Sequence, residues 1–366
     1  MSLDFALIGH SESWEAATAV VSALRGRGPS PIPADEVRDI LPWLPPRPVC
    51  DVSVRSQNGN DVYGIYIDCF IPPDRLDHHF LRENLGRVRD AAECAIREGV
   101  RVASLGGFSS ILLEGKLDLL PPHPGTVFTT GNTLTVAFII QGIERAAKLA
   151  GRDLYDADLL IVGATGDVGS GCARCLASRV RKLLLCSRNS DRLDRIACEL
   201  TRLGSQVEAS TDLPALASNA DFVICAASVA SPVLLLEALP KGAIVCDAGY
   251  PKNLRPDFSP PDGVVFFGGL GEVVGGFSFD PDLLGILNPH PFLNVTHGCM
   301  LEGVVLALEG RFEAFSLGRG FICPARVEEI SNIAKKHGIV PAPLFGPKGS
   351  LEAQISTLLA EQEVRR

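Results

Sequence analysis

The feature that most constrains how this chain can fold is an alternation of short apolar strands and helices between residues 154 and 275. A buried strand is predicted at 157–162, a helix at 170–179 and the next strand at 182–188. The series continues with a helix over 191–203 and strands at 205–210, 221–228, 242–249 and 263–269. Strands and helices that alternate at this spacing form a parallel sheet covered by helices. The sequence therefore predicts an α/β protein with a doubly wound parallel sheet.

A chain of 366 residues is long for a single core. Upstream of the series, short strands are predicted within 4–10, 62–71 and 102–107, and a helix over 134–151. After about residue 275 the strand pattern stops, and the remainder is predicted as helices with a loop at 341–349. We expect three segments: a mixed α/β substrate domain over 1–153, a Rossmann domain over 154–275, and a C-terminal helical segment over 276–366 that packs on the first domain.

Composition narrows the class of protein. A net charge of −9 argues against a broad nucleic-acid-binding surface. The apolar runs fall short of the ~20 residues that span a bilayer, and the N-terminus does not resemble a signal peptide. The eleven cysteines are scattered singly through apolar runs, apart from Cys172 and Cys175, which we interpret as two residues on a helix face rather than a metal site. We expect a reduced cytoplasmic protein without disulfides or metal.

The first strand of the series runs into a glycine turn. Gly163, Gly166 and Gly169 follow a buried strand directly and open a helix. Glycines at this place allow a pyrophosphate to approach the backbone, so that its charge meets amide N–H groups at the helix start. The following strand ends in Ser187, Arg188 and Asn189, where an NAD site usually has Asp or Glu. An arginine with polar neighbours suits the additional phosphate of NADP, so we predict NADPH as cofactor.

The predicted cofactor contacts lie at the ends of four of these predicted strands. They are Gly163, Thr165, Gly166, Asp167, Val168, Gly169, Ser187, Arg188, Asn189, Ala227, Ser228 and Gly249.

Several stretches in order along the chain resemble one family. They are LIGHSES (7–13), GIYIDCFIP (64–72), SLGGFSSILLE (104–114), FTTGNT (128–133), VGATGDVGS (162–170), GYPKNL (249–254) and KHG (336–338). The sequence resembles the aldehyde-forming long-chain acyl-acyl-carrier-protein reductases of the cyanobacterial alkane pathway. The resemblance implies an NADPH-binding Rossmann domain between N-terminal and C-terminal parts, and reduction of a fatty acyl thioester to an aldehyde through an acyl group carried on one cysteine.

In that family the acyl-carrying cysteine precedes a glutamate by three positions at the start of a C-terminal helix, and the matching pair here is Cys299 and Glu302. A cysteine in the first turn of a helix gains from amide N–H groups that favour the thiolate. His297 is a candidate base or proton donor, with helix capping or simple exposure as the alternative. His10, Glu114, Thr130 and Asn132 lie in shared motifs without an assigned role.

The chain departs from the family pattern at several motifs that the resemblance places near the substrate. Thr296, His297 and Gly298 stand where aromatic or apolar residues are usual, and Leu134, Val273 and Leu317 replace two histidines and a tryptophan. These changes bear on two properties of the substrate: the length of its acyl chain and the identity of its carrier, which is either acyl-carrier protein or coenzyme A. An aldehyde-consuming enzyme is a further candidate partner.

Two other functions fit the layout. One is a shikimate-dehydrogenase-like NADP-dependent ketone–alcohol oxidoreductase, but Lys116 and Lys148 do not lie in that family's motif. The other is a catalytically silent NADP-binding sensor, against which the position of Cys299 argues. A glutamyl-tRNA-reductase-like enzyme would need its nucleophile near the N-terminus, and Cys50 lacks that motif.

Overall fold

The computed structural model describes residues 3–25, 32–228, 233–234, 236–250, 252–254, 264–281, 283–287, 290–318 and 320–355. The chain forms two compact units. Unit 1 comprises 1–134, 271–321 and 329–340, and unit 2 comprises 135–270, 322–328 and 341–366. The boundary therefore falls inside a helix and divides the C-terminal part between the units. The functional division at 153/154 and 275/276 stays a prediction.

Unit 1 is built on a six-stranded mixed sheet in the order β13-β2-β3-β1-β4-β5. Its strands are β1 (Phe5–Gly9), β2 (Arg47–Arg55), β3 (Asp61–Asp68), β4 (Val102–Leu105), β5 (Val127–Thr129) and β13 (Phe277–Asp280). The four strands β3, β1, β4 and β5 are parallel, so their carboxyl ends meet at one edge. β2 and β13 extend the sheet antiparallel.

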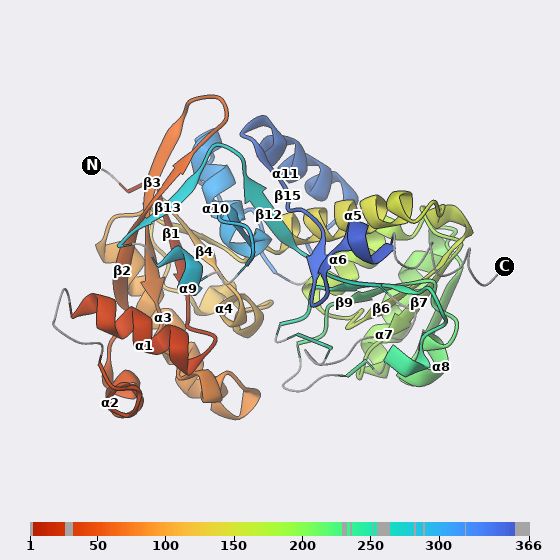
Figure 1. The fold of residues 1–366 in the computed structure, drawn as a ribbon, viewed down its shortest axis with the longest axis horizontal. Coiled ribbons are helices and arrows are strands. Elements are labelled where there is room, and N and C mark those ends of the chain that lie inside the picture. The colour runs from red at the N-terminus through yellow and green to blue at the C-terminus, as the bar shows by residue number, and fades with distance from the viewer. Residues whose placement is uncertain are drawn as a thin grey trace. The chain divides into compact units, whose positions relative to one another are not determined.

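The helices of unit 1 come from both ends of the chain. They are α1 (Trp14–Leu24), α2 (Ala34–Ile40), α3 (Leu81–Arg97), α4 (Phe108–Leu112), α9 (Leu284–Leu287) and α10 (Gly298–Glu309), together with much of α11 (Pro324–Lys336). α10 contacts β1, β3 and β4, so that its light-blue ribbon lies beside the red and orange strands of the N-terminal part (Figure 1). Ten of the twelve residues of α10 are buried, which makes this helix part of the core of unit 1.

Three further short strands form a second, smaller sheet that lies mostly in unit 1. β12 (Leu270–Val273) lies between β14 (Val295–His297) and β15 (Ile339–Pro341). The prediction that strands stop after residue 275 is therefore wrong. β13 alternates buried Phe277 and Phe279 with exposed Ser278 and Asp280, but it pairs with β2, more than 200 residues earlier in the chain. A strand of four residues with so distant a partner gives little local signal.

Unit 2 has a second six-stranded sheet, in the order β11-β10-β9-β6-β7-β8, and every recorded pair in it is parallel. The strands are β6 (Asp158–Val162), β7 (Lys182–Cys186), β8 (Val207–Ser210), β9 (Phe222–Cys225), β10 (Ile244–Asp247) and β11 (Val264–Phe267). The helices are α5 (Asn132–Leu149), α6 (Asp167–Leu176), α7 (Ser190–Arg202) and α8 (Leu213–Ala217).

Helices cover both faces of this sheet. Leu216 and Ala217 of α8 pack with Val265 on one face, whereas Gly142 of α5 lies against the neighbouring Phe266 on the other. Successive strand residues point to opposite faces. The predicted doubly wound sheet is thus confirmed. The segment 341–349, predicted as a loop, instead contains β16 (Phe345–Gly346) and the start of β17 (Gly349–Ser350), a hairpin too short to show periodicity.

Candidate functional site

The glycine turn after β6 requires its glycines. Gly163 has a φ of +85°, and a Cβ there would lie 2.7 Å from the Ala226 carbonyl oxygen. A Cβ on Gly169 would lie 2.2 Å from the Gly163 carbonyl oxygen, whereas one on Gly166 would meet nothing closer than 3.4 Å. Gly166 is the N-cap residue of α6, and Asp167, Val168 and Gly169 form the first turn. The turn is therefore closed on its protein side, and Gly166 leaves its outer side open for a phosphate group.

The carboxyl ends of β6, β9 and β10 bring the remaining predicted residues to this turn. The strand order reverses between β6 and β9, the point at which such sheets bind dinucleotides. Ala227 and Ser228 follow β9 and are half-buried, and Gly249 follows β10. The predicted residues of unit 2 therefore gather at one edge of its sheet.

Two residues of this edge were missed by the sequence analysis as site residues. The Asn253 amide accepts the Ala227 N–H at 3.0 Å and donates to the Ala227 carbonyl at 2.8 Å. Asp247, at the end of β10, accepts N–H groups of Gly249 and Asn253 at 3.1–3.2 Å. Burial raises the pKa of Asp247 above its usual range. Asn253 lies in the GYPKNL stretch (249–254), so this motif is the sequence signal that could have identified it as a site residue.

The end of β7 joins the same edge. Thr165 Oγ1 and Ser187 Oγ lie 2.6 Å apart, which connects the glycine turn to this strand. The Arg188 side chain is exposed. Asn189 is the N-cap residue of α7, and its side chain accepts the Arg192 N–H at 2.9 Å. Three features together fit a nicotinamide dinucleotide. Backbone atoms leave no room for a Cβ on Gly163 or Gly169, the start of α6 is open, and the Arg188 side chain is exposed.

In unit 1, Cys299 is the second residue of α10, with Gly298 as the first and His297 as the N-cap residue. Gly131, in the FTTGNT stretch, lies directly against its backbone. A Cβ on Gly131 would stand 2.1 Å from the Cys299 carbonyl oxygen and 2.3 Å from its Cα, and Gly131 has a φ of +69°. Only glycine fits this approach, so Gly131 fixes the start of α10 against the end of β5.

The Cys299 thiol is buried, with 9% of the residue exposed. Burial raises its pKa to about 11, whereas backbone N–H groups of Gly107, Met300 and Cys299 itself act in the opposite direction. The amide contribution expected at the helix start is present and favours the thiolate, but desolvation has the larger effect on this pKa.

The turn after β4 surrounds this cysteine. Met300 fills the space beside two glycines: a Cβ on Gly106 would lie 2.2 Å from Met300 Cε, and one on Gly9 would lie 2.9 Å from the same atom. Gly107 has φ +52° and ψ −124°, a conformation that is essentially restricted to glycine. The SLGGFSS stretch therefore packs against the Cys299–Met300 pair at the ends of β1 and β4.

Glu302 is fully buried on the next turn of α10. Its Oε1 accepts the Thr129 hydroxyl at 2.5 Å, and its Oε2 accepts the Leu134 N–H at 3.1 Å and the Ser316 hydroxyl at 2.8 Å. These donors come from β5, α5 and the chain after α10. The carboxylate therefore joins three segments of unit 1.

His297 is the N-cap residue of α10, two positions before Cys299. Its ring is half-buried and packs edge-on against His290 with 5.4 Å between ring centroids, and its side chain makes no capping hydrogen bond to α10. The structure thus brings Cys299 and Glu302 together on one helix and places His297 just before it.

The KHG stretch forms a separate buried group at the other end of α10. His337 Nε2 lies 2.7 Å from Glu309 Oε2, and His337 Nδ1 lies 3.2 Å from Ser56 Oγ. Ser56 and His337 are each 2% exposed. Hydrogen bonds to Lys336 and His337 hold the pKa of Glu309 below its usual range. Because the serine is enclosed, this chain of contacts connects α10, α11 and the β2–β3 hairpin rather than forming an open site.

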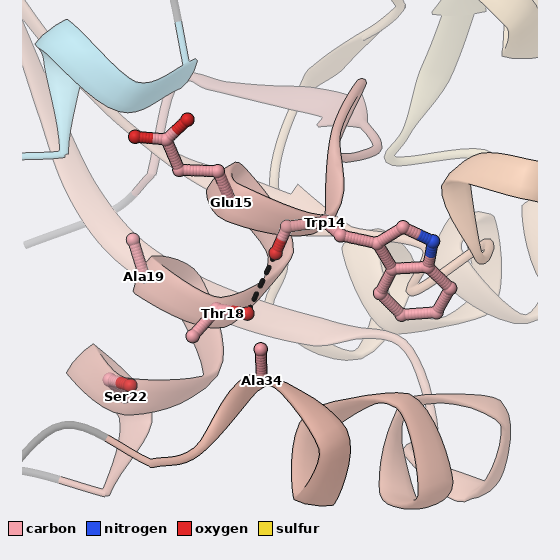
Figure 2. Close-up of a pocket in the computed structure, with 6 residues that line it drawn as sticks. All are labelled: Trp14, Glu15, Thr18, Ala19, Ser22 and Ala34. Atoms are coloured by element: carbon pink, nitrogen blue, oxygen red, sulfur yellow. Dashed lines mark hydrogen bonds between the residues drawn. The ribbon is translucent and has the colours of Figure 1, made fainter.

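A groove of about 530 Å³ lies along α1 and α2 (Figure 2). Its lining residues are Trp14, Glu15, Thr18, Ala19, Ser22 and Ala34. Figure 2 shows the Trp14 ring and the Glu15 carboxylate pointing in different directions, with the Thr18 hydroxyl donating to the Trp14 carbonyl at 2.7 Å. None of the site residues expected from the sequence lines this groove.

The cysteines differ in how far they are exposed to solvent. All eleven cysteines lie in described parts of the chain as free thiols, and Cys198 is exposed, Cys323 is intermediate and the others are buried. Cys172 and Cys175 both lie on α6. Within the described ranges, no group of three or more His, Cys, Asp or Glu side chains could hold a metal ion, and no helix is long and apolar enough to cross a membrane.

Comparison with known proteins defines the class of protein. The family model described as shikimate / quinate 5-dehydrogenase matches residues 144–267, the region of the glycine turn and its sheet. Among solved structures, glutamyl-tRNA reductase from Methanopyrus kandleri aligns over 94% of this chain and 77% of its own, with 19% identity and a TM-score of 0.30. The chain is an NADP-dependent oxidoreductase with a Rossmann cofactor domain.

The relatives narrow this class to a family. The long-chain acyl-[acyl-carrier-protein] reductase of Synechococcus elongatus is 32% identical over 349 residues, which cover 93% of this chain and 99% of that protein. Aminotransferase PigE of a Serratia species is 27% identical over 70% of this chain and 30% of its own length. The chain belongs to the family of long-chain acyl-acyl-carrier-protein reductases, as a divergent member. The resemblance found in the sequence is confirmed.

Proposed function

We propose that this protein reduces the acyl thioester of an acyl-carrier protein to an aldehyde, with NADPH as cofactor and Cys299 as the residue that carries the acyl group. The observation that supports this most directly is the position of Cys299: a thiol at the second residue of α10, where backbone N–H groups lower its pKa against the larger effect of burial. It occurs in a chain that belongs to a family of acyl-carrier-protein reductases. Residues 1–153 and 276–366 then hold the acyl group, and 154–275 hold the cofactor.

The acyl transfer is a thioester exchange. The Cys299 sulfur attacks the carbonyl carbon, a new C–S bond forms, the bond to the carrier sulfur breaks, and the thiol proton of Cys299 is transferred to the departing carrier thiolate. The N–H groups of Gly107 and Met300 stabilise negative charge on the sulfur while the proton moves. NADPH, when bound, supplies the hydride that converts an acyl thioester to the aldehyde level. The carbon–sulfur bond then breaks, which releases the aldehyde and leaves the Cys299 thiolate, and this thiolate takes up a proton from solvent through His297.

The other two candidate residues take different roles in this proposal. Both oxygens of Glu302 already accept hydrogen bonds from protein donors, so Glu302 orients the start of α10 and does not carry the proton. His297 is half-buried immediately before Gly298, and its imidazole is the proposed proton carrier. A His297→Gln variant should therefore slow turnover while leaving the acyl-enzyme able to form.

The cofactor specificity follows from the end of β7. Arg188 is exposed there, without the acidic residue that binds the ribose hydroxyls of NAD, and we assign it to the 2′-phosphate of NADPH. The Gly163–Gly169 turn and the start of α6 hold the pyrophosphate, and Ala227, Ser228 and Gly249 line the nicotinamide side.

The test is single-turnover labelling. Purified protein is mixed with a long-chain acyl-acyl-carrier protein, without NADPH, and its intact mass is measured; the expected gain is one acyl group that hydroxylamine removes. Addition of NADPH should then release one equivalent of aldehyde. Cys299→Ser should lose both signals and keep NADPH binding, whereas the control Cys198→Ser, at an exposed cysteine of α7, should keep both.

Three outcomes separate the alternatives. Acylation from the coenzyme A thioester but not from the carrier protein would replace the carrier in this proposal. Acylation of Cys299→Ser at another cysteine, or full aldehyde production by that variant, would contradict the covalent mechanism and favour direct reduction of the bound thioester. Oxidation or reduction of ketone and alcohol substrates alone would favour the shikimate-dehydrogenase-like function.

A further inference from the structure

His10 is a buried histidine that the proposed mechanism does not use. It follows β1 at the edge where the parallel strands of unit 1 end, and 7% of the residue is exposed. Its ring packs edge-on against Phe108, with 6.3 Å between centroids. Burial lowers the pKa of His10 to about 4, so the ring is neutral at physiological pH.

The hydrogen bonds of this ring define its tautomer. His10 Nε2 lies 3.2 Å from the backbone nitrogen of Phe108, which can only donate, so Nε2 accepts and carries no proton. Nδ1 therefore carries the proton and lies 3.4 Å from the Ser11 carbonyl oxygen. The ring thus connects the end of β1 with the first residue of α4.

The partner of His10 belongs to the turn that surrounds Cys299. Phe108 directly follows Gly107, whose backbone N–H lowers the pKa of the Cys299 thiol, and Gly106 lies against Met300. Gly107 adopts φ +52° and ψ −124°, so its amide orientation depends on the contacts that hold the turn from either side. On one side that contact is the Gly106 N–H, which donates to the Ile8 carbonyl at 2.8 Å; on the other it is Phe108 N–H to His10.

We propose that His10 is a positioning residue: by accepting the Phe108 N–H through Nε2, it fixes the Gly106–Phe108 turn so that the Gly107 amide faces the Cys299 sulfur. His10 does not touch the reacting atoms in this role. It acts through the orientation of one backbone amide. The role in catalysis rests on the proposed function of Cys299, but the effect on the thiol itself does not.

The chain allows a matched pair of substitutions. The side-chain oxygen of a glutamine reaches about as far as imidazole Nε2, so His10→Gln keeps an acceptor for Phe108 N–H. The side chain of His10→Asn reaches only as far as Nδ1 and cannot replace that acceptor. Both variants are neutral and polar, so they differ mainly in this hydrogen bond.

The measurement is the rate of iodoacetamide modification of Cys299 at pH 8, followed by peptide mass mapping, with the exposed Cys198 of unit 2 as internal reference. Loss of one hydrogen bond to the thiolate raises the thiol pKa by about one unit, so His10→Asn should slow modification of Cys299 about tenfold. His10→Gln should stay within about twofold of the unchanged protein, and Cys198 should react equally in all three.

Acyl transfer should follow the same order, with NADPH binding unchanged. Equal Cys299 reactivity in all three proteins would overturn the proposal, and so would an equal loss in His10→Gln and His10→Asn, because the acceptor would then not be what matters. A variant that loses thermal cooperativity and exposes Cys299 to faster modification would also contradict it. If the unchanged protein never forms an acyl-enzyme, the proposed function fails, but the modification rates still test His10.

Discussion

Each unit of this protein has a glycine turn at the carboxyl end of a parallel strand, but the two turns need glycine for different structural reasons. After β6, a Cβ on Gly163 or Gly169 would collide with the backbone of the turn itself or of the segment after β9, whereas one on Gly166 would make only an ordinary contact at 3.4 Å. After β4, a Cβ on Gly106 would collide with Met300, a side chain from α10. The first turn is closed on itself and open to a ligand, whereas the second is shaped to receive another part of the chain.

This difference explains why unit 2 lends itself to recognition from local sequence and unit 1 does not. The three glycines of the turn after β6 lie within seven residues of one another, directly between a buried strand and a helix, so their spacing is visible in the sequence. The turn after β4 depends on Cys299 and Met300, about 190 residues later. Its function cannot be inferred from its own residues. The following predictions test whether the two turns are as independent as this comparison implies.

The largest effect should come from a side chain at Gly131 that overlaps the Cys299 backbone. Gly131→Ala places a Cβ on the Cys299 backbone at a φ of +69°, which should cost about 2–5 kcal/mol of unfolding free energy from left-handed strain and overpacking. Since a displacement of about 1 Å can cost about 100-fold in rate, aldehyde formation should fall by at least that factor. NADPH binding by unit 2 should persist.

The matched control is Gly99→Ala. Gly99 also belongs to unit 1 and has a φ of +72°, but a Cβ there would meet nothing within 4 Å. It should cost only about 1–2 kcal/mol and leave aldehyde formation unchanged. If both variants lose activity equally, left-handed strain and not contact with Cys299 is responsible.

The next largest effect should be the pH dependence of Cys299 itself. Its pKa is raised to about 11 by burial, so the thiolate fraction increases about tenfold per pH unit throughout the neutral range. Iodoacetamide modification of Cys299 should therefore rise about 100-fold between pH 7 and pH 9, as read by peptide mapping. A rate that levels off by pH 8 would mean that the amide groups at the helix start outweigh burial at Cys299.

The sequence predicts the fold of unit 2 because each strand, turn and helix there carries its own local signal. The position of Cys299 in the first turn of a helix is also predictable, from the apolar spacing of 301–308. The sign of its pKa shift is not, because desolvation depends on how Gly131 and Gly106 enclose it. Likewise, the sequence places Glu302 three positions after Cys299, but its three donors lie in segments 14 to 173 residues away.

A smaller effect should define the cofactor side of the comparison. Arg188→Ala removes the exposed cation at the end of β7 and should weaken NADPH binding by about 10–100-fold, the scale of a lost charge-assisted contact, while NADH binding stays nearly unchanged. Arg202→Ala, at the far end of α7, is the control for general loss of positive charge. Equal weakening of both cofactors, measured by fluorescence titration, would remove Arg188 from the 2′-phosphate.

The smallest effect concerns the contact that joins the glycine turn to β7. Thr165 Oγ1 and Ser187 Oγ share a hydrogen bond of 2.6 Å, and both side chains are half-buried. Thr165→Val removes it at nearly constant volume and should weaken NADPH binding by about fivefold, corresponding to about 1 kcal/mol for one neutral hydrogen bond. Reactivity of Cys299 toward iodoacetamide should not change, since this contact lies within unit 2.

A double-mutant cycle isolates that hydrogen bond from any direct contact of either hydroxyl with the cofactor. Ser187→Ala should lose about as much affinity as Thr165→Val, and the double variant should lose little more than either one, because the second change removes a group whose partner is already gone. Losses that multiply in the double variant would show that the hydroxyls act separately. In that case the turn after β6 would depend on its glycines alone, and the comparison with the turn after β4, which His10 and α10 hold from outside, would become sharper still.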